Sequence, residues 1–288
     1  MKAHYFLLAA LIIETLCIFY LARRKFVSSL KTLENKLLIQ FKYKNRASLQ
    51  DDANAWYTQN GLVIAHAGGG VMYSGYLNSK ESVSSVVKSG ATVIEIDVCL
   101  TKDMIPVLSH RFEPDGEIMF SETPSLKQFL GVPLPNNNTP LTLEFLLSEF
   151  KNWSGYFLID CAFGTEKFVS DWLCMNCTEA QKEHIIFQVH EIQFLKELAR
   201  KKQFGYLHYN ASIENLESIL PVLVACEVHS VSVDDHEIKN SDSLSKINNA
   251  GIHVYAYTVN HKRRFDFLMK SGASGVFSDR LCSQEHAQ

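Results

Sequence analysis

The stretch from Thr92 to Arg111 reads TVIEIDVCLTKDMIPVLSHR, and the interpretation of the whole chain starts from it. Its first half, Thr92 to Leu100, is an apolar run that predicts a buried strand, but Glu95 and Asp97 interrupt it. Residues two positions apart in a strand point to the same face, so the two carboxylates project together. Burying two like charges side by side is costly unless a cation or a basic group compensates them. We therefore expect a functional site here.

The composition is that of a globular protein with a large core. The chain has 288 residues, of which 47% are hydrophobic and 20% are charged, a length that fits one sizeable domain with additions. The formal net charge of −3 gives no indication of a nucleic-acid partner. Seven cysteines, an odd number scattered along the chain, do not make a disulfide framework.

The N-terminus predicts a membrane anchor over residues 1–25. The segment from Tyr5 to Ala22 is apolar except for Glu14 and Thr15, near the lower limit of the roughly 17–25 residues that span a bilayer. Basic residues follow this segment where a secretory signal would show a small-residue cleavage site. We expect an uncleaved single-pass anchor, with a signal peptide or a buried helix as alternatives. The excess of basic residues after the span favours the cytoplasmic side for the rest of the chain.

Residues 26–60 show a helical pattern with leucines on one face and many lysines elsewhere. One interpretation is a basic amphipathic helix that lies on anionic lipid, which makes membrane lipid a partner of the N-terminal segment. The other is a linker helix packed on the main domain. Both remain open on the sequence.

From residue 61 to residue 288, apolar runs typical of strands alternate with helical patterns. The eight strand candidates are Leu62–Ala65, Thr92–Leu100, Tyr156–Ile159, Ile185–Val189, Gly205–Tyr209, Val228–Val233, Ile252–Val259 and Gly275–Ser278. A further short apolar run, Ile105 to Leu108, leads to His110. Repeated β–α units of this number favour an α/β fold of the TIM (β/α)8 barrel type over an open doubly wound sheet. The irregular stretch from Arg111 to Thr139 predicts a long loop.

Polar residues gather where these strands end, and barrel chemistry is found at the C-terminal ends of strands. They are His66, Glu95, Asp97, Asp160, Gln188, Asp234, Asn260 and Asp279. Singly, a histidine such as His66 or His110 is more often structural, and Asp160 could be a helix cap. Together, two histidines suit proton transfer and three carboxylates suit a hard divalent cation.

The ordered set of motifs resembles the glycerophosphodiester phosphodiesterase family, a TIM-barrel group of metal-dependent enzymes, over Leu62 to Leu281. The segments that carry the resemblance are His66-Ala67-Gly68, Glu81-Ser82, Glu95-Ile96-Asp97, His110-Arg111, Thr142-Leu143-Glu144, Asp160-Cys161-Ala162, Tyr257-Thr258-Val259-Asn260 and Ser278-Asp279. They stand in the family's order, each close to a predicted strand end or helix start.

The resemblance implies a metal-dependent phosphodiester hydrolase. Three carboxylates would hold one divalent cation, Mg²⁺ or Ca²⁺, and two histidines would act as general base and general acid on a small-molecule or lipid-headgroup phosphodiester. The implied residues are Glu95, Asp97 and Asp160 for the metal, His66 and His110 for proton transfer, and Arg111, Gly68, Asn260 and Tyr257 for substrate binding. The glycines after His66 allow a ligand to approach the backbone closely.

Two departures from the family pattern concern positive charge. Ala67 stands where the family has arginine, and Ala162 stands where it has lysine. Two such losses are worth several kcal/mol of transition-state stabilisation unless another cation replaces them, and Arg111 and Lys80 are candidates. The alternatives to a hydrolase are therefore a non-catalytic membrane-anchored ligand-binding barrel and a phosphotransferase that stops at a cyclic phosphate.

Overall fold

The computed structural model describes residues 55–70, 78–112, 120 and 122–282. The predicted anchor, residues 1–25, and most of the predicted linker helix, residues 26–60, lie outside these ranges, so both stay predictions. Within the described ranges, no helix combines the length and the apolar character that crossing a bilayer requires.

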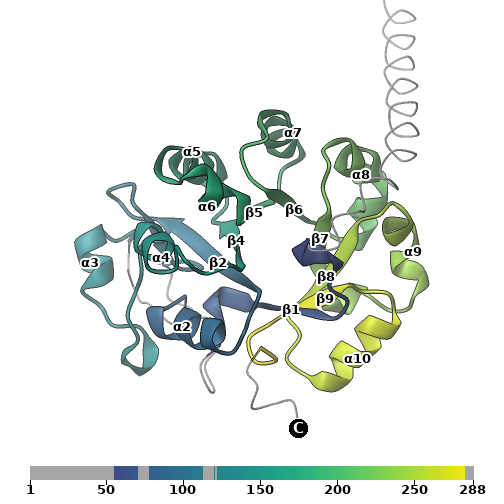
Figure 1. Ribbon diagram of the computed structural model, residues 1–288, viewed down its shortest axis with the longest axis horizontal. Coiled ribbons are helices and arrows are strands. Elements are labelled where there is room, and N and C mark those ends of the chain that lie inside the picture. The colour runs from purple at the N-terminus through teal and green to yellow at the C-terminus, as the bar shows by residue number, and fades with distance from the viewer. Residues whose placement is uncertain (1–54, 71–77, 113–119, 121, 283–288) are drawn as a thin grey trace, which may run out of the picture. The chain divides into compact units, whose positions relative to one another are not determined.

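The described chain closes into a barrel of parallel strands (Figure 1). The parallel strands are β1 (Leu62–Ala65), β2 (Val93–Leu100), β4 (Tyr156–Cys161), β5 (Ile185–Val189), β6 (Tyr206–Asn210), β7 (Ser230–Asp234), β8 (His253–Tyr257) and β9 (Gly275–Ser278). Each pairs with its neighbour in the parallel sense, and the pairing of β1 with both β9 and β2 closes the ring. A ninth strand, β3 (Pro106–Leu108), runs antiparallel along β2. The predicted TIM-barrel architecture is confirmed.

The helices surround the ring of strands on its outside (Figure 1). They are α2 (Lys80–Lys88), α3 (Leu126–Leu130), α4 (Leu143–Glu149), α5 (Glu166–Asn176), α6 (Glu179–Glu183), α7 (Ile192–Lys201), α8 (Ile213–Ala225), α9 (Asp242–Asn249) and α10 (Lys262–Lys270). Short 3₁₀ turns occupy Trp56–Thr58, His66–Gly68, Pro135–Asn137 and Asp235–Glu237.

Side-chain caps fix where several helices begin. The Thr142 hydroxyl accepts a hydrogen bond from the backbone N–H of Phe145, 3.0 Å away, and so caps the start of α4. At the start of α2, Ser79 and Ser82 form a reciprocal capping box. A cap of this kind stabilises a helix by about 1 kcal/mol.

Two short helices were not predicted. Helix α3 lies inside the stretch expected to be an irregular loop, and it begins at Ser125, which forms a capping box with Gln128. Helix α6 follows α5 after a break at Cys177 and begins at the cap Thr178. Both are five residues long, too short to show the 3.6-residue periodicity that reveals a helix in a sequence.

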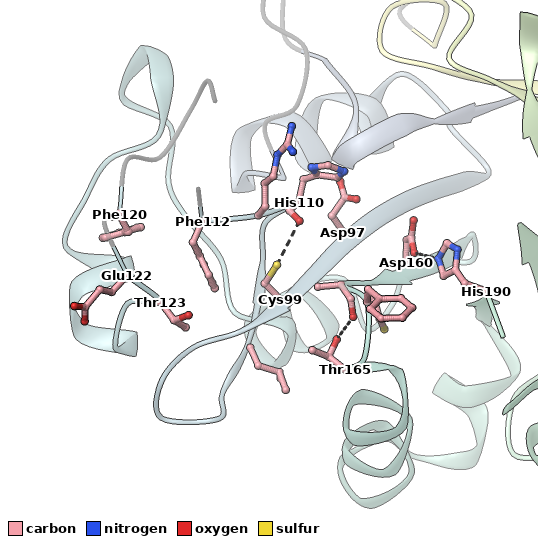
Figure 2. A pocket seen from close by; sticks show the side chains of 15 residues that line it. Asp97, Cys99, His110, Phe112, Phe120, Glu122, Thr123, Asp160, Thr165 and His190 are labelled. Carbon is pink, nitrogen blue, oxygen red and sulfur yellow. Dashed lines mark hydrogen bonds and ion pairs between the residues drawn. The ribbon is translucent and has the colours of Figure 1, made fainter. Parts of the chain in front are cut away.

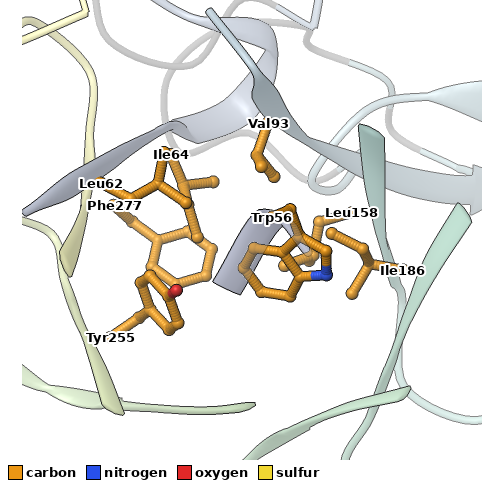
Figure 3. Packing of buried hydrophobic residues seen from close by; sticks show 8 residues of the cluster. All are labelled: Trp56, Leu62, Ile64, Val93, Leu158, Ile186, Tyr255 and Phe277. Atoms are coloured by element: carbon orange, nitrogen blue, oxygen red, sulfur yellow. The ribbon is translucent and has the colours of Figure 1, made fainter. Parts of the chain in front are cut away.

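An apolar cluster fills the end of the barrel where the strands begin. Trp56 stands in its centre, surrounded by side chains from the strands, and only 1% of its surface is exposed (Figure 3). The other members are Leu62, Ile64, Val93, Leu158, Ile186, Tyr255 and Phe277. Trp56 precedes β1, so the packing of the barrel includes residues from the segment expected to be a linker.

Candidate active site

The candidate site is the layer of inward-facing side chains directly above the apolar cluster. Residues two positions apart on a strand share a face, so a polar residue two positions after a cluster residue also points into the barrel. The pairs are Val93 and Glu95, Leu158 and Asp160, and Phe277 and Asp279. The strands thereby present an apolar layer and then a polar layer toward their C-terminal ends.

The three predicted metal ligands come together in this layer. Asp97 and Asp160 are direct partners in the parallel register of β2 and β4. One carboxylate oxygen from each, together with one from Glu95, lies within 4.8 Å of the others. Glu95 and Asp97 are only 3% and 6% exposed.

This carboxylate group is suited to a divalent cation. Burial, and then the charge of Asp97, raises the pKa of Glu95 well above its usual value. Burial, and then the charge of Asp160, raises the pKa of Asp97. Both pKa values are raised because like charges lie close together out of water, which costs free energy. A bound cation would remove this cost. Oxygen donors of this kind are the ligands that Mg²⁺ and Ca²⁺ prefer.

A second group of potential ligands, Asp234, Asp235 and His236, lies after β7. There the guanidinium of Arg264 contacts the Asp235 carboxylate, 2.7 Å from Nε to Oδ2. The charge of Asp235 is already compensated, so the group around Glu95 is the better candidate metal centre.

Hydrogen bonds fix the orientation of the two buried carboxylates. The backbone N–H of Ala67 donates to Glu95 Oε2 at 2.6 Å. The Asn78 amide donates to Asp97 Oδ2 at 2.8 Å, and its oxygen accepts from the Asp97 backbone N–H at 3.2 Å. Asn78 therefore holds Asp97 by both its side chain and its backbone.

Sequence reasoning did not single out Asn78, although it placed a family motif at Glu81-Ser82, three positions further along the chain. Glu81 instead accepts hydrogen bonds from the backbone and hydroxyl of Thr139, on the exposed surface. The signal that was available is the dipeptide Asn78-Ser79, because Ser79 caps helix α2 and the asparagine immediately precedes that cap.

His66 is held by a carboxylate from the last strand. Its Nδ1 lies 2.7 Å from Asp279 Oδ1. Burial alone would lower the pKa of His66, but the hydrogen bond to Asp279 and the charges of Glu95 and Asp97 raise it to about 9. The same pair lowers the pKa of Asp279, against the effect of its burial. Asn260, predicted to bind substrate, donates to Asp279 Oδ2 at 2.6 Å, so it also orients this carboxylate.

A cavity of about 930 Å³ opens beside the carboxylates. Asp97 and His110 line it from β2 and the segment after β3, and Asp160 and His190 line it from the ends of β4 and β5 (Figure 2). Arg111 lines the same cavity. The structure thus brings His110, two of the three predicted metal ligands and Arg111 to one opening, whereas His66 and Glu95 are not among the residues that line it.

His190 is a second residue that sequence reasoning missed. Its Nε2 lies 2.8 Å from Asp160 Oδ1 (Figure 2). Burial lowers the pKa of His190, but the hydrogen bond to Asp160 and the charge of that group raise it overall. In the sequence, His190 follows Val189, the last residue of a predicted strand, which was the available signal.

Two other predicted substrate-binding residues lie away from this cavity. Gly68 has a φ of +76°, and a Cβ added there would stand 3.2 Å from the Asn78 backbone and 3.3 Å from Ser82 Oγ. The glycine thus permits close packing against α2. The Tyr257 hydroxyl donates to Asn210 Oδ1 at 3.2 Å, and its ring packs on the apolar cluster.

The two alanine positions differ in their surroundings. Ala67 is fully buried, whereas Ala162 lines the cavity. Lys80, one suggested replacement for the missing charge, lies 3.4 Å from Glu149 in an ion pair and stacks over the ring of Phe145. Of the two suggested cations, Arg111 is the one at the cavity.

Solved structures with the same fold include several phosphodiesterases. A putative glycerophosphoryl diester phosphodiesterase from Agrobacterium tumefaciens is 14% identical with a TM-score of 0.62, and the match covers 77% of this chain and 94% of that one. An Oleispira antarctica phosphodiesterase, solved with the product sn-glycerol-3-phosphate, is 19% identical with a TM-score of 0.61 and the same coverage. A glycerophosphodiester phosphodiesterase from Thermotoga maritima is 18% identical with a TM-score of 0.58, covering 76% and 94%.

At these identities the solved structures show a shared fold. A search of curated proteins gave no match. The family model for the glycerophosphoryl diester phosphodiesterase family, however, matches residues 66–116 and 113–282, which is well over half of the sequence. The chain therefore belongs to the glycerophosphoryl diester phosphodiesterase family, a family of phosphoric diester hydrolases.

Proposed function

We propose that this protein hydrolyses a glycerophosphodiester or a lipid-derived phosphodiester with the help of one divalent cation, Mg²⁺ or Ca²⁺. The observation that carries the proposal is the meeting of Glu95, Asp97 and Asp160 within 4.8 Å, beside a cavity that His110 and Arg111 line. The Oleispira antarctica relative, solved with sn-glycerol-3-phosphate, supports a substrate of this size and charge.

The two histidines would share the proton transfers. Because Nδ1 of His66 bonds Asp279, Nε2 is the nitrogen that would exchange a proton with the substrate. One histidine takes the proton of the attacking substrate hydroxyl, and the other gives a proton to the departing alkoxide. Water then opens the cyclic phosphate with these roles reversed, leaving a phosphomonoester and an alcohol.

Charge at the phosphate would come from two sources. Glu95, Asp97 and Asp160 would hold the cation, which would supply Lewis-acid stabilisation of the charge on the phosphate. Arg111 would contribute a guanidinium from the mouth of the cavity, in place of the arginine and lysine that the family has at positions 67 and 162.

The test is a kinetic assay of the full chain on phosphodiesters with added Mg²⁺ or Ca²⁺. We expect His66→Gln to lower kcat/KM by about 10²–10⁴-fold, the usual contribution of general acid–base catalysis. His236→Gln is the matched control, because His236 is 90% exposed and lies outside the cavity. Equal losses in both variants, or no turnover of any diester by the wild type, would refute the proposal.

The fate of the phosphate distinguishes the hydrolase from a phosphotransferase that stops at a cyclic product. We expect ³¹P NMR of the reaction to show a phosphomonoester that accumulates, with the cyclic phosphate as a transient at most. A cyclic phosphate that persists after the substrate is exhausted would favour the phosphotransferase.

A further inference from the structure

We propose that the substrate carries an apolar acyl or alkyl chain next to its phosphodiester, and that aromatic side chains of the cavity bind this chain. This inference rests on the proposed phosphodiesterase function and specifies its substrate class. It comes from the part of the cavity that the acid–base and metal residues do not occupy.

One wall of the cavity is aromatic and firmly supported. Phe112 and Phe120 line it on the side away from Asp160 and His190 (Figure 2). Their rings contact edge to face, with centroids 6.2 Å apart, and Phe112 contacts the fully buried Phe129 of α3 in the same way at 6.0 Å.

This wall continues into a larger apolar cluster. Phe112 and Phe120 pack against a buried group that consists of Cys99, Val107, Phe129 and Leu134. Because both rings already pack on buried side chains, binding an apolar group there costs less side-chain ordering than binding it on unsupported rings.

A third aromatic side chain reaches the cavity from the end of β4. Phe163 lines the cavity and is 83% exposed, the highest value among the large hydrophobic residues of the described chain. Its neighbour Ala162 also lines the cavity and packs against the cluster around Phe129. An exposed phenyl ring beside a reaction site gains free energy when a ligand covers it.

The size of the cavity agrees with a chain-bearing substrate. Its volume of about 930 Å³ is near the upper end of the roughly 300–1,000 Å³ typical of ligand pockets. A flexible chain fits this opening better than a rigid ring system, because the aromatic surfaces come from separate segments, Phe112 and Phe120 after β3 and Phe163 after β4.

The experiment compares two diesters that differ only in the chain: sn-glycero-3-phosphocholine and its 1-hexanoyl ester, which stays monomeric in water. Both keep the hydroxyl beside the phosphate. A fully buried methylene is worth about fourfold in binding, so partial burial of the chain predicts a kcat/KM at least about tenfold higher for the ester. We expect Phe163→Ser to lower this ratio about fivefold.

The matched control is Met175→Ser, which removes another strongly exposed apolar side chain, 77% exposed, from α5 outside the cavity. It should leave the ratio unchanged. Equal kcat/KM for the two diesters, or equal effects of the two serine variants, would overturn the chain-binding inference while the phosphodiesterase proposal stands. If the wild type hydrolyses neither diester, the chain-binding inference fails, and the phosphodiesterase proposal fails with it when no other diester of the kinetic assay is hydrolysed.

Discussion

Replacing Glu95 by glutamine should change stability in opposite directions with and without a cation. Without a cation, Glu95 is a buried carboxylate beside two others, and burial and like charge raise its pKa. Glutamine keeps an oxygen that accepts from the Ala67 N–H and removes the charge. We expect the variant to be more stable than the wild type by about 1–2 kcal/mol, since the cost of burying an unneutralised charge disappears.

With a cation the order reverses. A ligand present at about 100 times its Kd stabilises the folded state by about 2.7 kcal/mol, which raises Tm by roughly 5–10 °C in a domain of this size. The wild type should show this rise with Mg²⁺ or Ca²⁺, and Glu95→Gln should lose most of it because one of three ligands no longer carries charge.

Differential scanning calorimetry with EDTA or with each metal measures both effects. Glu183→Gln, which changes an exposed carboxylate at the end of α6, is the matched control and should respond to metal like the wild type. A wild-type Tm that is the same with EDTA and with each metal would refute the reasoning. A Glu95→Gln variant less stable than the wild type in EDTA would also refute it.

Three further predictions concern stability and protonation. Burial lowers the pKa of His208 to about 3, so between about pH 6.5 and 3 the unfolded chain binds a proton on this histidine and the folded chain does not. Stability should fall by about 2 kcal/mol from pH 6.5 to 4.5, and His208→Gln should flatten this decline in urea unfolding. Trp56→Ala should cost about 3–5 kcal/mol in the same assay, because it empties the centre of the apolar cluster. The pair with Asp279 raises the pKa of His66 to about 9 against the effect of burial. The stability that this pair contributes to the fold is therefore complete below about pH 6.5 and is lost as pH rises through 9, and Asp279→Asn should lower the pKa of His66 in an NMR titration.

The barrel could be predicted because each strand is a local pattern. Every strand candidate matched a strand of the ring, since short apolar runs bounded by polar residues and helices are visible without knowing the fold. Trp56 could not be assigned in this way. It belongs to the core only because the closed ring leaves a space at the starts of the strands that its side chain fills.

The residues of the candidate site also differ in whether a local sequence pattern could reveal them. Glu95 and Asp97 were recognisable because charged residues rarely interrupt a buried strand, and that signal lies within a few positions. The supporting contacts depend on pairs far apart in sequence, such as His66 with Asp279, separated by 213 positions. No local pattern reports that Asn78 holds Asp97 or that His190 contacts Asp160.

Ala162, after the end of β4, stands where the family pattern has lysine, and it lies beside the aromatic wall. Ala162 packs against the apolar cluster around Phe129, so a lysine there would bring its ammonium group next to Phe112 and Phe120 and would occupy the space between the wall and the carboxylates. A small residue at position 162 keeps that space open and apolar. Positive charge at the phosphate must then come from another segment, and Arg111 lines the same cavity from the segment after β3. Under the proposed function, this rearrangement retains a cation for the phosphate and opens the neighbouring wall to a chain.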